Sequence, residues 1–250
     1  MTAMPFIESM RPFEAVVAFV DILGFKDFVR RAFESEAGTL EAITDVLRVI
    51  SRKAQAENSS LGSDIDGSTE FRATPFSDNI VLSARHSESG VFRVLDVAAS
   101  LTAALMWRGF VCRGAVATGL LVHSEALLFG PGLIRAYELE QKAAIYPRII
   151  VMDELCPRKY SAHWRLRQDS DGFWFIDVFD RIRRTTWVGH DRSQNLFRIR
   201  DRILLQLRQA RNIGALDVLA KHRWLAAKFN EFVAAEMNGQ VIPIEIEEAV

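Results

Sequence analysis

An unbroken apolar run that ends in a carboxylate and a glycine constrains this chain most. Residues 15–20 are apolar, and Asp21 and then Gly24 follow them at the start of a helix-like segment. The run predicts a buried strand, and a carboxylate at its end is costly to bury unless it is paired or coordinated. Such a strand, with a glycine turn into a helix, can hold a metal ion beside a phosphate. The alternative, a buried strand whose aspartate caps the next helix, fits this stretch equally well.

The bulk composition excludes several classes of protein. The chain has 250 residues, an apolar fraction of 49% and a formal net charge of −1, which suits one large domain, or one domain with an appendage. Near-neutrality argues against a general binder of nucleic acid or membrane surfaces. Cys112 and Cys156 lack metal-type spacing and indicate reduced thiols. With no signal pattern and no apolar run long enough to span a bilayer, we expect a cytoplasmic protein with no nucleic-acid and no membrane partner.

Periodicity predicts strands and helices in an order typical of an α+β fold, with a largely antiparallel sheet of the split βαβ type. A boundary near Tyr160 would divide a domain at 15–158 from a C-terminal extension at 159–250 that contains a strand and two helices. The basic run at 181–184 fits a solvated loop. We expect helices at 26–33, 39–57, 91–107, 130–144, 194–213 and 215–237, strands at 15–20, 110–119 and 147–152, an arm or hairpin at 120–128, and hairpins at 70–84 and 164–179.

Two aspartates form the first candidate site. Asp21 ends the central strand, and Asp78 occupies the tip of the hairpin predicted at 70–84. In a split βαβ sheet these elements are neighbours, so the carboxylates can converge and suit a pair of divalent ions, with the Ile22 carbonyl as a further ligand. Such ions can lower the pKa of a ribose hydroxyl and neutralise a leaving pyrophosphate. By itself, Asp78 is more often an ordinary turn residue in S-D-N.

Two further segments carry weaker signals. Arg113, beside an otherwise apolar strand, needs a partner, which is a phosphate or, more commonly, an internal carboxylate. The Gly-rich turn at 130–132 leads into a helix with Arg135, Tyr137 and Glu138 on its first turns, although these glycines alone could simply end the arm. The histidines have no metal spacing, and the chain has no nucleophile elbow, P-loop or dinucleotide fingerprint.

Together these segments resemble the catalytic domain of the class III nucleotidyl cyclases, over about residues 16–152. F-V-D-I-L-G-F at 19–25 resembles the first metal motif, with Asp21 and the Ile22 carbonyl as ligands, and F-S-D-N-I-V-L at 76–82 resembles the second, with Asp78. R-G-A-V-A-T-G at 113–119 resembles the strand before the dimerisation arm, and 130–140 falls where the family has its G-x-x-V-N-x-A-x-R-L-E helix. The resemblance implies a ferredoxin-like antiparallel sheet with flanking helices, two Mn²⁺ or Mg²⁺ ions, a nucleoside triphosphate substrate, and a homodimer with sites at its interface.

Four positions depart from the family pattern. The family's Asn and Arg that support the transition state fall at Ile134 and Glu138, and its base-reading Lys and acid fall at Thr74 and Leu127. The metal half of the site is therefore retained, and the purine-reading half is not. With A-Y-E-L-E at 136–140 and Y-P-R-I-I-V at 146–151, this pattern is similar to the pyrimidine cyclases of bacterial Pycsar anti-phage systems.

That similarity implies a homodimer that converts UTP, or CTP, to cyclic UMP or cyclic CMP and pyrophosphate. A separate effector protein would sense the product. Arg135 is then a catalytic candidate and shares the phosphate charge with Arg113 and Arg148. The alternatives are a catalytically inactive cyclase-like domain that binds nucleotide and signals through its C-terminal helices, and a purine cyclase. The implied substrate-binding residues are Phe19, Gly24, Phe25, Thr74, Arg113 and Arg148.

Overall fold

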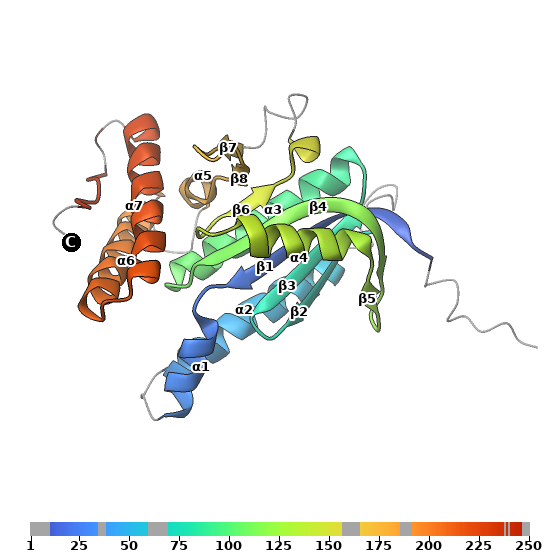
Figure 1. The fold of residues 1–250 in the computed structure, drawn as a ribbon, viewed down its shortest axis with the longest axis horizontal. Helices are drawn as coiled ribbons and strands as arrows, with labels where there is room; N and C mark the ends of the chain where they lie inside the picture. The colour runs from blue at the N-terminus through green and yellow to red at the C-terminus, as the bar shows by residue number, and fades with distance from the viewer. Residues whose placement is uncertain are drawn as a thin grey trace, which may run out of the picture.

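A mixed sheet lies at the centre of the protein (Figure 1). The computed structural model describes residues 11–34, 39–59, 70–156, 166–185, 192–237, 239 and 241–246. In these ranges the strand order is β2-β3-β1-β4-β6-β8-β7, with β5 paired to β4. All neighbouring strands are antiparallel except β4 and β6, which confirms the predicted α+β class. The strands are β1 (Phe13–Ile22), β2 (Arg72–Phe76), β3 (Asn79–Arg85), β4 (Cys112–His123), β5 (Leu128–Phe129), β6 (Ile149–Val151), β7 (Leu166–Gln168) and β8 (Trp174–Ile176).

Helices cover both faces of this sheet. α2 and α3 lie on one face and α4 lies on the other, while α6 and α7 stand together beside the sheet (Figure 1). Each predicted helix is present, with its ends shifted by a few residues. The helices are α1 (Phe25–Phe33), α2 (Thr39–Ser59), α3 (Glu88–Trp107), α4 (Pro131–Ala143), α5 (Val178–Arg184), α6 (Arg192–Asn212) and α7 (Leu216–Glu236), with a 3-10 turn, η3 (Asp153–Leu155), after β6.

The surroundings of β1 explain why residues 15–20 form a continuous apolar run. Successive side chains of a strand point to opposite faces. Val16, Ala18 and Val20 belong to the core beneath α3, whereas Val17 and Phe19 belong to the core beneath α4. Since β1 pairs with β3 on one side and β4 on the other, it is buried in every direction, and both sets of positions must be apolar.

β4 is longer than predicted and carries the arm. It continues past Gly119 to His123, and residues 124–127 turn the chain back into β5, which pairs with the end of β4. α4 begins directly on this strand, because a Cβ at Gly132 would lie 2.9 Å from the Gly119 carbonyl oxygen. The two glycines therefore bring helix and strand closer together than side chains would allow.

α3 is the central helix of the larger core. By length and composition it could cross a membrane, so the expectation that no segment is long and apolar enough is wrong. Within the protein, however, 67% of its most apolar stretch is buried. It packs against β1 and β3 on one side and against α5 and α6 on the other. A core helix placed between a sheet and other helices is expected to be apolar over most of its circumference.

The C-terminal helices build a second core against α3. Phe179 of α5 packs edge-on against Phe229 of α7, with 5.4 Å between the ring centroids, and Ala103 and Met106 of α3 belong to the same core. The hairpin of β7 and β8 has its turn at the predicted residues 169–172, and it joins the sheet beside β6. The predicted domain boundary between 158 and 159 lies outside the described residues.

The basic run at 181–184 is not the solvated loop we expected, because it forms the end of α5. Asp177 caps this helix by accepting a hydrogen bond from the Phe179 backbone N–H at 3.1 Å. Phe179 and Ile182 are buried in the C-terminal core, and Arg181 donates to Asp96 of α3 at 2.9 Å. The cap and these apolar positions favour a helix more strongly than the charges favour a loop.

The close contact of α4 and β4 predicts the effect of Gly132→Ala. Helix propensity alone favours alanine by about 1 kcal/mol, but the new Cβ would lie 2.9 Å from backbone. We therefore expect a net loss of about 1–2 kcal/mol in the free energy of unfolding, measured by urea titration. Lys142→Ala on the exposed side of α4 is the control and should change stability by less than about 0.5 kcal/mol. An equally stable or stabilised Gly132→Ala variant would contradict the packing described.

Candidate active site

A groove of about 550 Å³ opens where β1 ends and β3 begins, beneath α4. One wall is aromatic: the rings of Phe19 and Tyr137 meet edge to face, with 5.4 Å between their centroids, and Phe76 lies 6.3 Å from Phe19. The other end is charged. A mostly apolar groove with a few convergent polar groups is the usual form of a small-molecule site. Its lining residues are Phe19, Asp21, Phe76, Asn79, Arg113, Leu133, Ile134, Tyr137 and Gln141.

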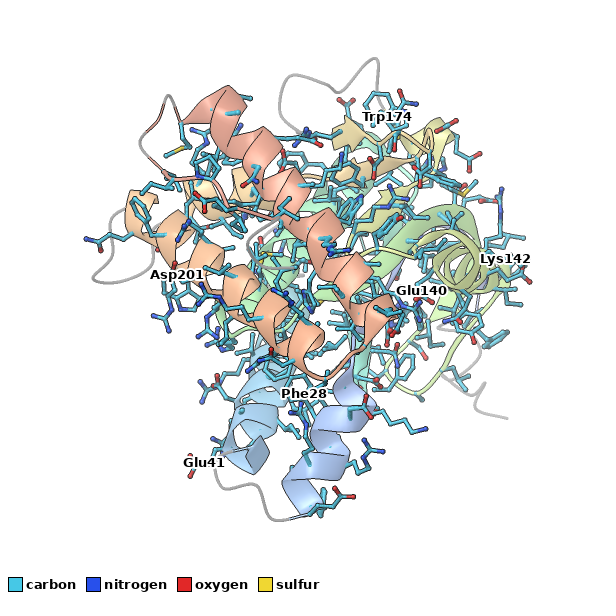
Figure 2. The ribbon with its side chains drawn as sticks, turned by 60° about the vertical axis from the view of Figure 1, so that its left-hand side comes forward. Phe28, Glu41, Glu140, Lys142, Trp174 and Asp201 are labelled. Carbon is cyan, nitrogen blue, oxygen red and sulfur yellow. The ribbon has the colours of Figure 1, made fainter. Side chains whose placement is uncertain are left out.

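The charged end is built around Arg113, which lies between two carboxylates. The β1–β4 register places Arg113 opposite Asp21, and its Nε donates to Asp21 Oδ2 at 3.2 Å. The same Nε lies 2.6 Å from Oε1 of Glu140 on α4. Glu140 is completely buried and lies on the inner side of α4, whereas Lys142 points outward (Figure 2). Arg113 thus has the internal carboxylate partner that the sequence favoured.

Burial determines the ionisation of this group. It raises the pKa of Asp21, against the lowering effect of Arg113, and the charge of Asp78 raises it further. Burial also raises the pKa of Glu140; Arg113 and Gln141 lower it, and Asp21 raises it. When both acids are ionised, the group of Asp21, Arg113 and Glu140 carries a net negative charge. A cation bound beside Asp21 would therefore be favoured.

The hairpin tip brings Asp78 to the end of β1, as the sequence predicted. The backbone N–H of Ile22 donates to the Asp78 carbonyl oxygen at 3.1 Å, which ties the tip to the strand. Asn79 Nδ2 donates to Asp78 Oδ1 at 3.1 Å, and Ser77 adopts a positive φ of 54° in the turn. Asp78 is close enough to Asp21 to influence its pKa, so Ile22 lies between two acidic residues.

The donor set fits a divalent ion in an open site. Among the residues that the structure describes, no three His, Cys, Asp or Glu side chains gather as a ready-made metal cage. Mg²⁺ is usually held by one or two carboxylates, with waters and substrate phosphates completing its shell. Asp21, Asp78 and the Ile22 carbonyl can provide such a partial set. Asp21 would share its carboxylate between the ion and Arg113.

Two other residues of the first motif lie beside the groove and do not line it. Phe25 is 6% exposed and packs into the core beneath α3. Gly24 precedes α1 with φ of 75°, and a Cβ there would meet nothing within 4 Å, so the glycine serves the turn from strand to helix through its backbone conformation. Neither residue is among those lining the groove. Phe19 is the aromatic residue of this motif that reaches it.

Thr74 belongs to a partly buried chain of hydrogen bonds that connects the end of β4 to β2 and β3. Its hydroxyl lies 2.7 Å from His123 Nε2, and His123 Nδ1 lies 2.7 Å from the Ser83 hydroxyl. Burial lowers the pKa of His123 to about 4, and the charge of Arg72 lowers it further. The imidazole is therefore neutral near pH 7, with one ring nitrogen donating and the other accepting. Sequence spacing gave no sign of this chain.

Arg135 projects from α4 without reaching the groove. Its Nη1 donates to the Thr118 carbonyl at 3.1 Å and lies 3.9 Å from Glu154 Oε1. Its side chain is 51% exposed. The two positions that replace the family's Asn and Arg differ from each other: Ile134 lines the groove, while Glu138 pairs with Lys142 at the surface.

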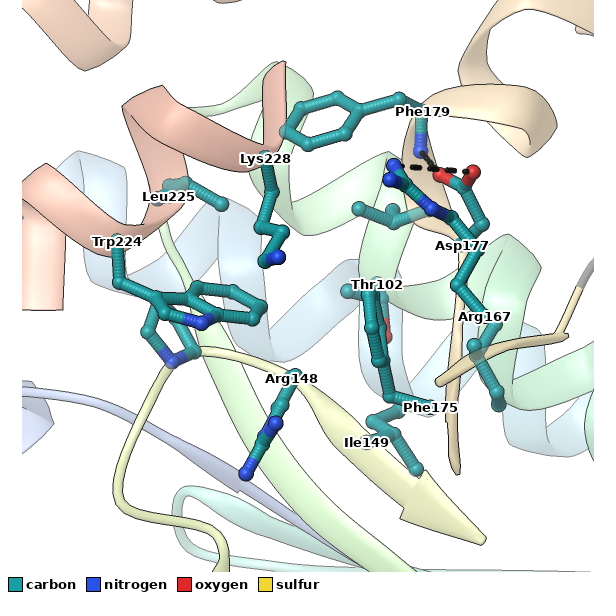
Figure 3. Close-up of a pocket in the computed structure, with 13 residues that line it drawn as sticks. Thr102, Arg148, Ile149, Arg167, Phe175, Asp177, Phe179, Trp224, Leu225 and Lys228 are labelled. Atoms are coloured by element: carbon teal, nitrogen blue, oxygen red, sulfur yellow. Dashed lines mark hydrogen bonds and ion pairs between the residues drawn. The ribbon is translucent and has the colours of Figure 1, made fainter. Parts of the chain in front are cut away.

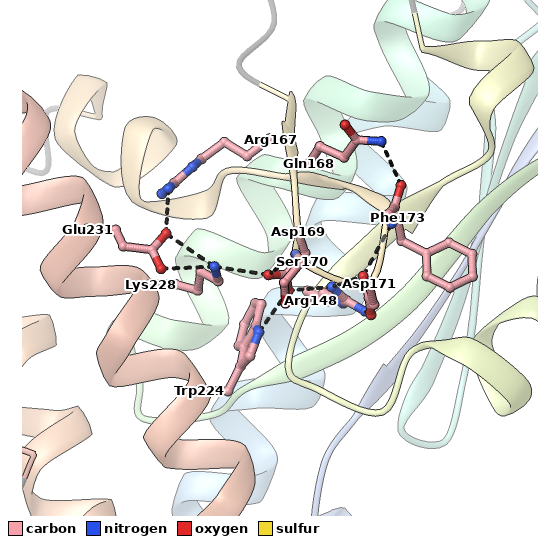
Figure 4. Close-up of polar contacts among 11 residues, drawn as sticks. Arg148, Arg167, Gln168, Asp169, Ser170, Asp171, Phe173, Trp224, Lys228 and Glu231 are labelled. Carbon is pink, nitrogen blue, oxygen red and sulfur yellow. Dashed lines mark hydrogen bonds and ion pairs between the residues drawn. The ribbon is translucent and has the colours of Figure 1, made fainter.

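Arg148 lies directly before β6 and is not brought to the groove. Its guanidinium pairs with Asp169, at 2.5 Å, and with Asp171, both from the β7–β8 turn (Figure 4). Lys228 of α7 lies 3.0 Å from Asp169, and Trp224 Nε1 donates to the same carboxylate at 2.8 Å. This network joins the C-terminal helix to the sheet, so the arginine has a structural partner for its charge.

The side chains beside this network close the contact between α7 and the sheet. Trp224 and Leu225 of α7 face Phe175 and Ile149 across an enclosed space of about 10 Å³ (Figure 3). A space of that size is at the limit for a single water molecule. It is packing between two parts of the fold and offers no room for a nucleotide.

Glu140 is the functional residue that the sequence interpretation missed. It follows Ala136 by one helical turn, and both residues are completely buried. A glutamate on the apolar face of an amphipathic helix requires a buried cation. That signal was present in A-Y-E-L-E at 136–140, but the pattern alone did not identify Arg113 as the cation.

Comparisons with known proteins give distant similarities. No family model and no curated protein matches the chain. A solved bacterial light-regulated adenylyl cyclase matches with 11% identity and a TM-score of 0.44, over 77% of this chain and 58% of that one. The guanylyl cyclase Cya2 matches with 12% identity and a TM-score of 0.42, over 67% and 93%. The guanylyl cyclase domain of the RhoGC fusion protein from the aquatic fungus Blastocladiella emersonii matches with 12% identity and a TM-score of 0.42, over 67% of this chain and 97% of that one. This chain thus spans little more than half of the light-regulated enzyme.

The raised pKa of Glu140 predicts how stability depends on pH. Its pKa is raised from an ordinary 4.5, so above about that pH the folded protein binds more protons than the unfolded chain. Stability contributed by this group therefore falls as pH rises. We expect the free energy of unfolding of the wild type, relative to Glu140→Gln, to fall between pH 4.5 and 7 in urea titrations. A difference that rises with pH would mean that Arg113 outweighs burial.

Proposed function

We propose that this chain is a nucleotide cyclase that closes a nucleoside triphosphate to a 3′,5′-cyclic nucleotide. The observation that carries the proposal is that Asp78 lies close to Asp21, which itself lines the charged end of an aromatic groove. The order of the segments that resemble class III cyclase motifs supports it. In the reaction, the ribose 3′-oxygen forms a bond to the α-phosphorus, the bond to the β-phosphate oxygen breaks, and pyrophosphate leaves.

The residues divide this task between them. Asp21, Asp78 and the Ile22 carbonyl would hold the divalent ions, Mn²⁺ or Mg²⁺. When bound, these ions supply positive charge that lowers the pKa of the 3′-hydroxyl and neutralises the pyrophosphate. Phe19 and Tyr137 give a wall against which the nucleoside can lie. Arg113 lines the groove and is fixed by two carboxylates, so its outer N–H groups can meet a phosphate without losing that orientation.

The base preference that we propose is for a pyrimidine, with UTP before CTP. The positions where purine cyclases read the base carry a short Thr74 and an apolar Leu127. The Thr74 hydroxyl is engaged by His123 at 2.7 Å. A site without long polar groups has no strong means to select adenine or guanine. In the anti-phage role that the resemblance suggests, the cyclic product would act on a separate effector in the cytoplasm.

A catalytically inactive, nucleotide-binding domain is the second candidate. Ile134 lines the groove where the family has its transition-state asparagine, and Glu138 faces Lys142 where the family has its arginine. These replacements remove transition-state stabilisation and leave binding. Two convergent carboxylates favour the enzyme, since a protein that only binds nucleotide does not need both.

The proposed enzyme is a homodimer whose sites lie between protomers. Leu120, Phe129 and Ile134, with Phe76 and Tyr137, are each at least 45% exposed around the arm and the start of α4. Such side chains on neighbouring elements are typical of a protein interface. A second copy docked there could bring its Arg135 to the groove, which would explain why Arg135 lies outside the groove of its own chain.

The substrate prediction is tested with purified protein, Mn²⁺ and all four ribonucleoside triphosphates at equal concentration. We expect cyclic UMP as the main product by mass spectrometry, with cyclic CMP second. Dominant cyclic AMP or cyclic GMP would contradict the pyrimidine preference, and nucleotide binding without product would favour the inactive domain.

Asp21→Ala and Asp78→Ala should each lower kcat at least about 10³-fold, because removing one carboxylate weakens charge stabilisation in the transition state. Asp201→Ala changes an exposed residue of α6; it is the control and should keep full activity.

The interface prediction is tested with Phe129→Glu. Phe129 is 56% exposed at the arm, and a charge there should be costly to bury between two chains. We expect wild-type dimers and mostly monomeric variant by light scattering at micromolar concentration, with cyclase activity lost together with the dimer. Ile213→Glu, at the turn between α6 and α7, changes a 76% exposed residue and should leave both properties unchanged. A monomeric wild type with full activity would refute the arrangement.

A further inference from the structure

A second hollow, of about 330 Å³, lies where α6 crosses the end of α3. It shares no lining residue with the groove and lies on the side of the sheet covered by α2 and α3. Three of its lining side chains are arginines, and one is a carboxylate. The lining residues are Ala42, Asp45, Trp107, Arg108, Phe110, Arg198 and Arg202.

The charges of this hollow do not balance. Arg108 Nε donates to Asp45 Oδ2 at 2.7 Å, which satisfies one arginine. Arg198 lies over the Trp107 ring, 4.2 Å from its centroid. Within the described part of the chain, neither Arg198 nor Arg202 has a carboxylate within ion-pair distance. Two positive charges are therefore left over at one surface.

Arg202 is held in place without an anionic partner. A Cβ at Gly109 would lie 2.6 Å from Arg202 Nη1, so the guanidinium rests directly on this turn. Gln206, one helical turn further on, donates to the Gly109 carbonyl at 2.7 Å. Arg202 Nε is buried and lacks a hydrogen-bond partner among the described residues. Burial lowers the pKa of Arg202, and the charges of Arg198 and Arg108 lower it further.

Three guanidinium groups that lie close together despite their mutual repulsion are expected to bind an anion. Like charges at close range destabilise a fold unless they are neutralised. Guanidinium groups match the oxygens of phosphates through paired N–H donors. The surplus of two positive charges matches a doubly charged phosphoryl group better than a single carboxylate, and the apolar sides of Trp107 and Phe110 close the hollow behind it.

We propose that this hollow binds a phosphorylated small molecule, whose phosphoryl oxygens are held by Arg198 and Arg202 with Arg108 beside them. The ligand would bridge α6 to the α2–α3 side of the sheet. Its binding would therefore stabilise the packing of the C-terminal helices against the sheet. The site would act independently of the proposed cyclase reaction.

The test is binding of inorganic phosphate and of pyrophosphate to the full chain, by titration calorimetry and thermal unfolding, in EDTA and at ionic strength matched with NaCl. EDTA removes the metal-dependent route to the groove, and an Asp21→Ala background should bind unchanged. We expect one site per chain and a Tm higher than in NaCl alone. A stronger response to pyrophosphate than to phosphate would assign the site to a diphosphorylated ligand; equal responses would assign it to a single phosphoryl group.

Arg198→Met and Arg202→Met should each weaken binding at least about tenfold, as expected for the loss of hydrogen bonds to a charged group. Arg208→Met removes an exposed arginine of the same helix outside the hollow and should bind like the wild type. Because Arg198 is exposed, its variant retains a fold even if Arg202→Met does not. No response of the wild type beyond NaCl, or equal losses in all three variants, would overturn the proposal.

Discussion

The pairing of Arg113 with Asp21 and Glu140 is the interaction on which the rest of the site depends. It joins two strands to a helix through one guanidinium, at 3.2 Å to Asp21 and 2.6 Å to Glu140. Glu140 has no exposure to water, so its charge must be balanced inside the protein. Removing the arginine would leave two carboxylates uncompensated, and removing either carboxylate would change the charge felt by the other. The packing of α4 and the ionisation of Asp21 are thus coupled through Arg113.

The groove follows from that packing. Its floor is the end of β1, and its aromatic wall joins a strand residue, Phe19, to Tyr137 on the first turns of α4. The glycine contact between α4 and β4 determines how near the helix can come. A small displacement of the helix would open the wall and weaken the Glu140 pairing together. Shape and charge at this site are therefore coupled through the same helix.

Local pattern predicted much of the fold, because β1, α3 and the long helices bury their apolar residues at regular intervals. The convergence of Asp21 and Asp78 was also predictable, since hairpin and strand are neighbours in the expected sheet. The partners of buried charges were not, because they depend on packing between distant segments: Arg113 with Glu140, and Arg148 with Asp169. At α5, the basic residues favoured a loop, although the sequence also contains a capping residue, Asp177, directly before the helix.

The two-sided burial of β1 has a consequence for how such a chain can change. Because its side chains alternate between two cores, the insertion or deletion of a single residue within 15–20 would exchange the two sets. Phe19 would leave the groove for the core beneath α3, and Asp21 would turn away from Arg113. Substitutions that conserve volume can be tolerated one at a time, but a one-residue register shift of this strand alters both cores and the acidic site together. Variation in length is therefore confined to other parts of the chain.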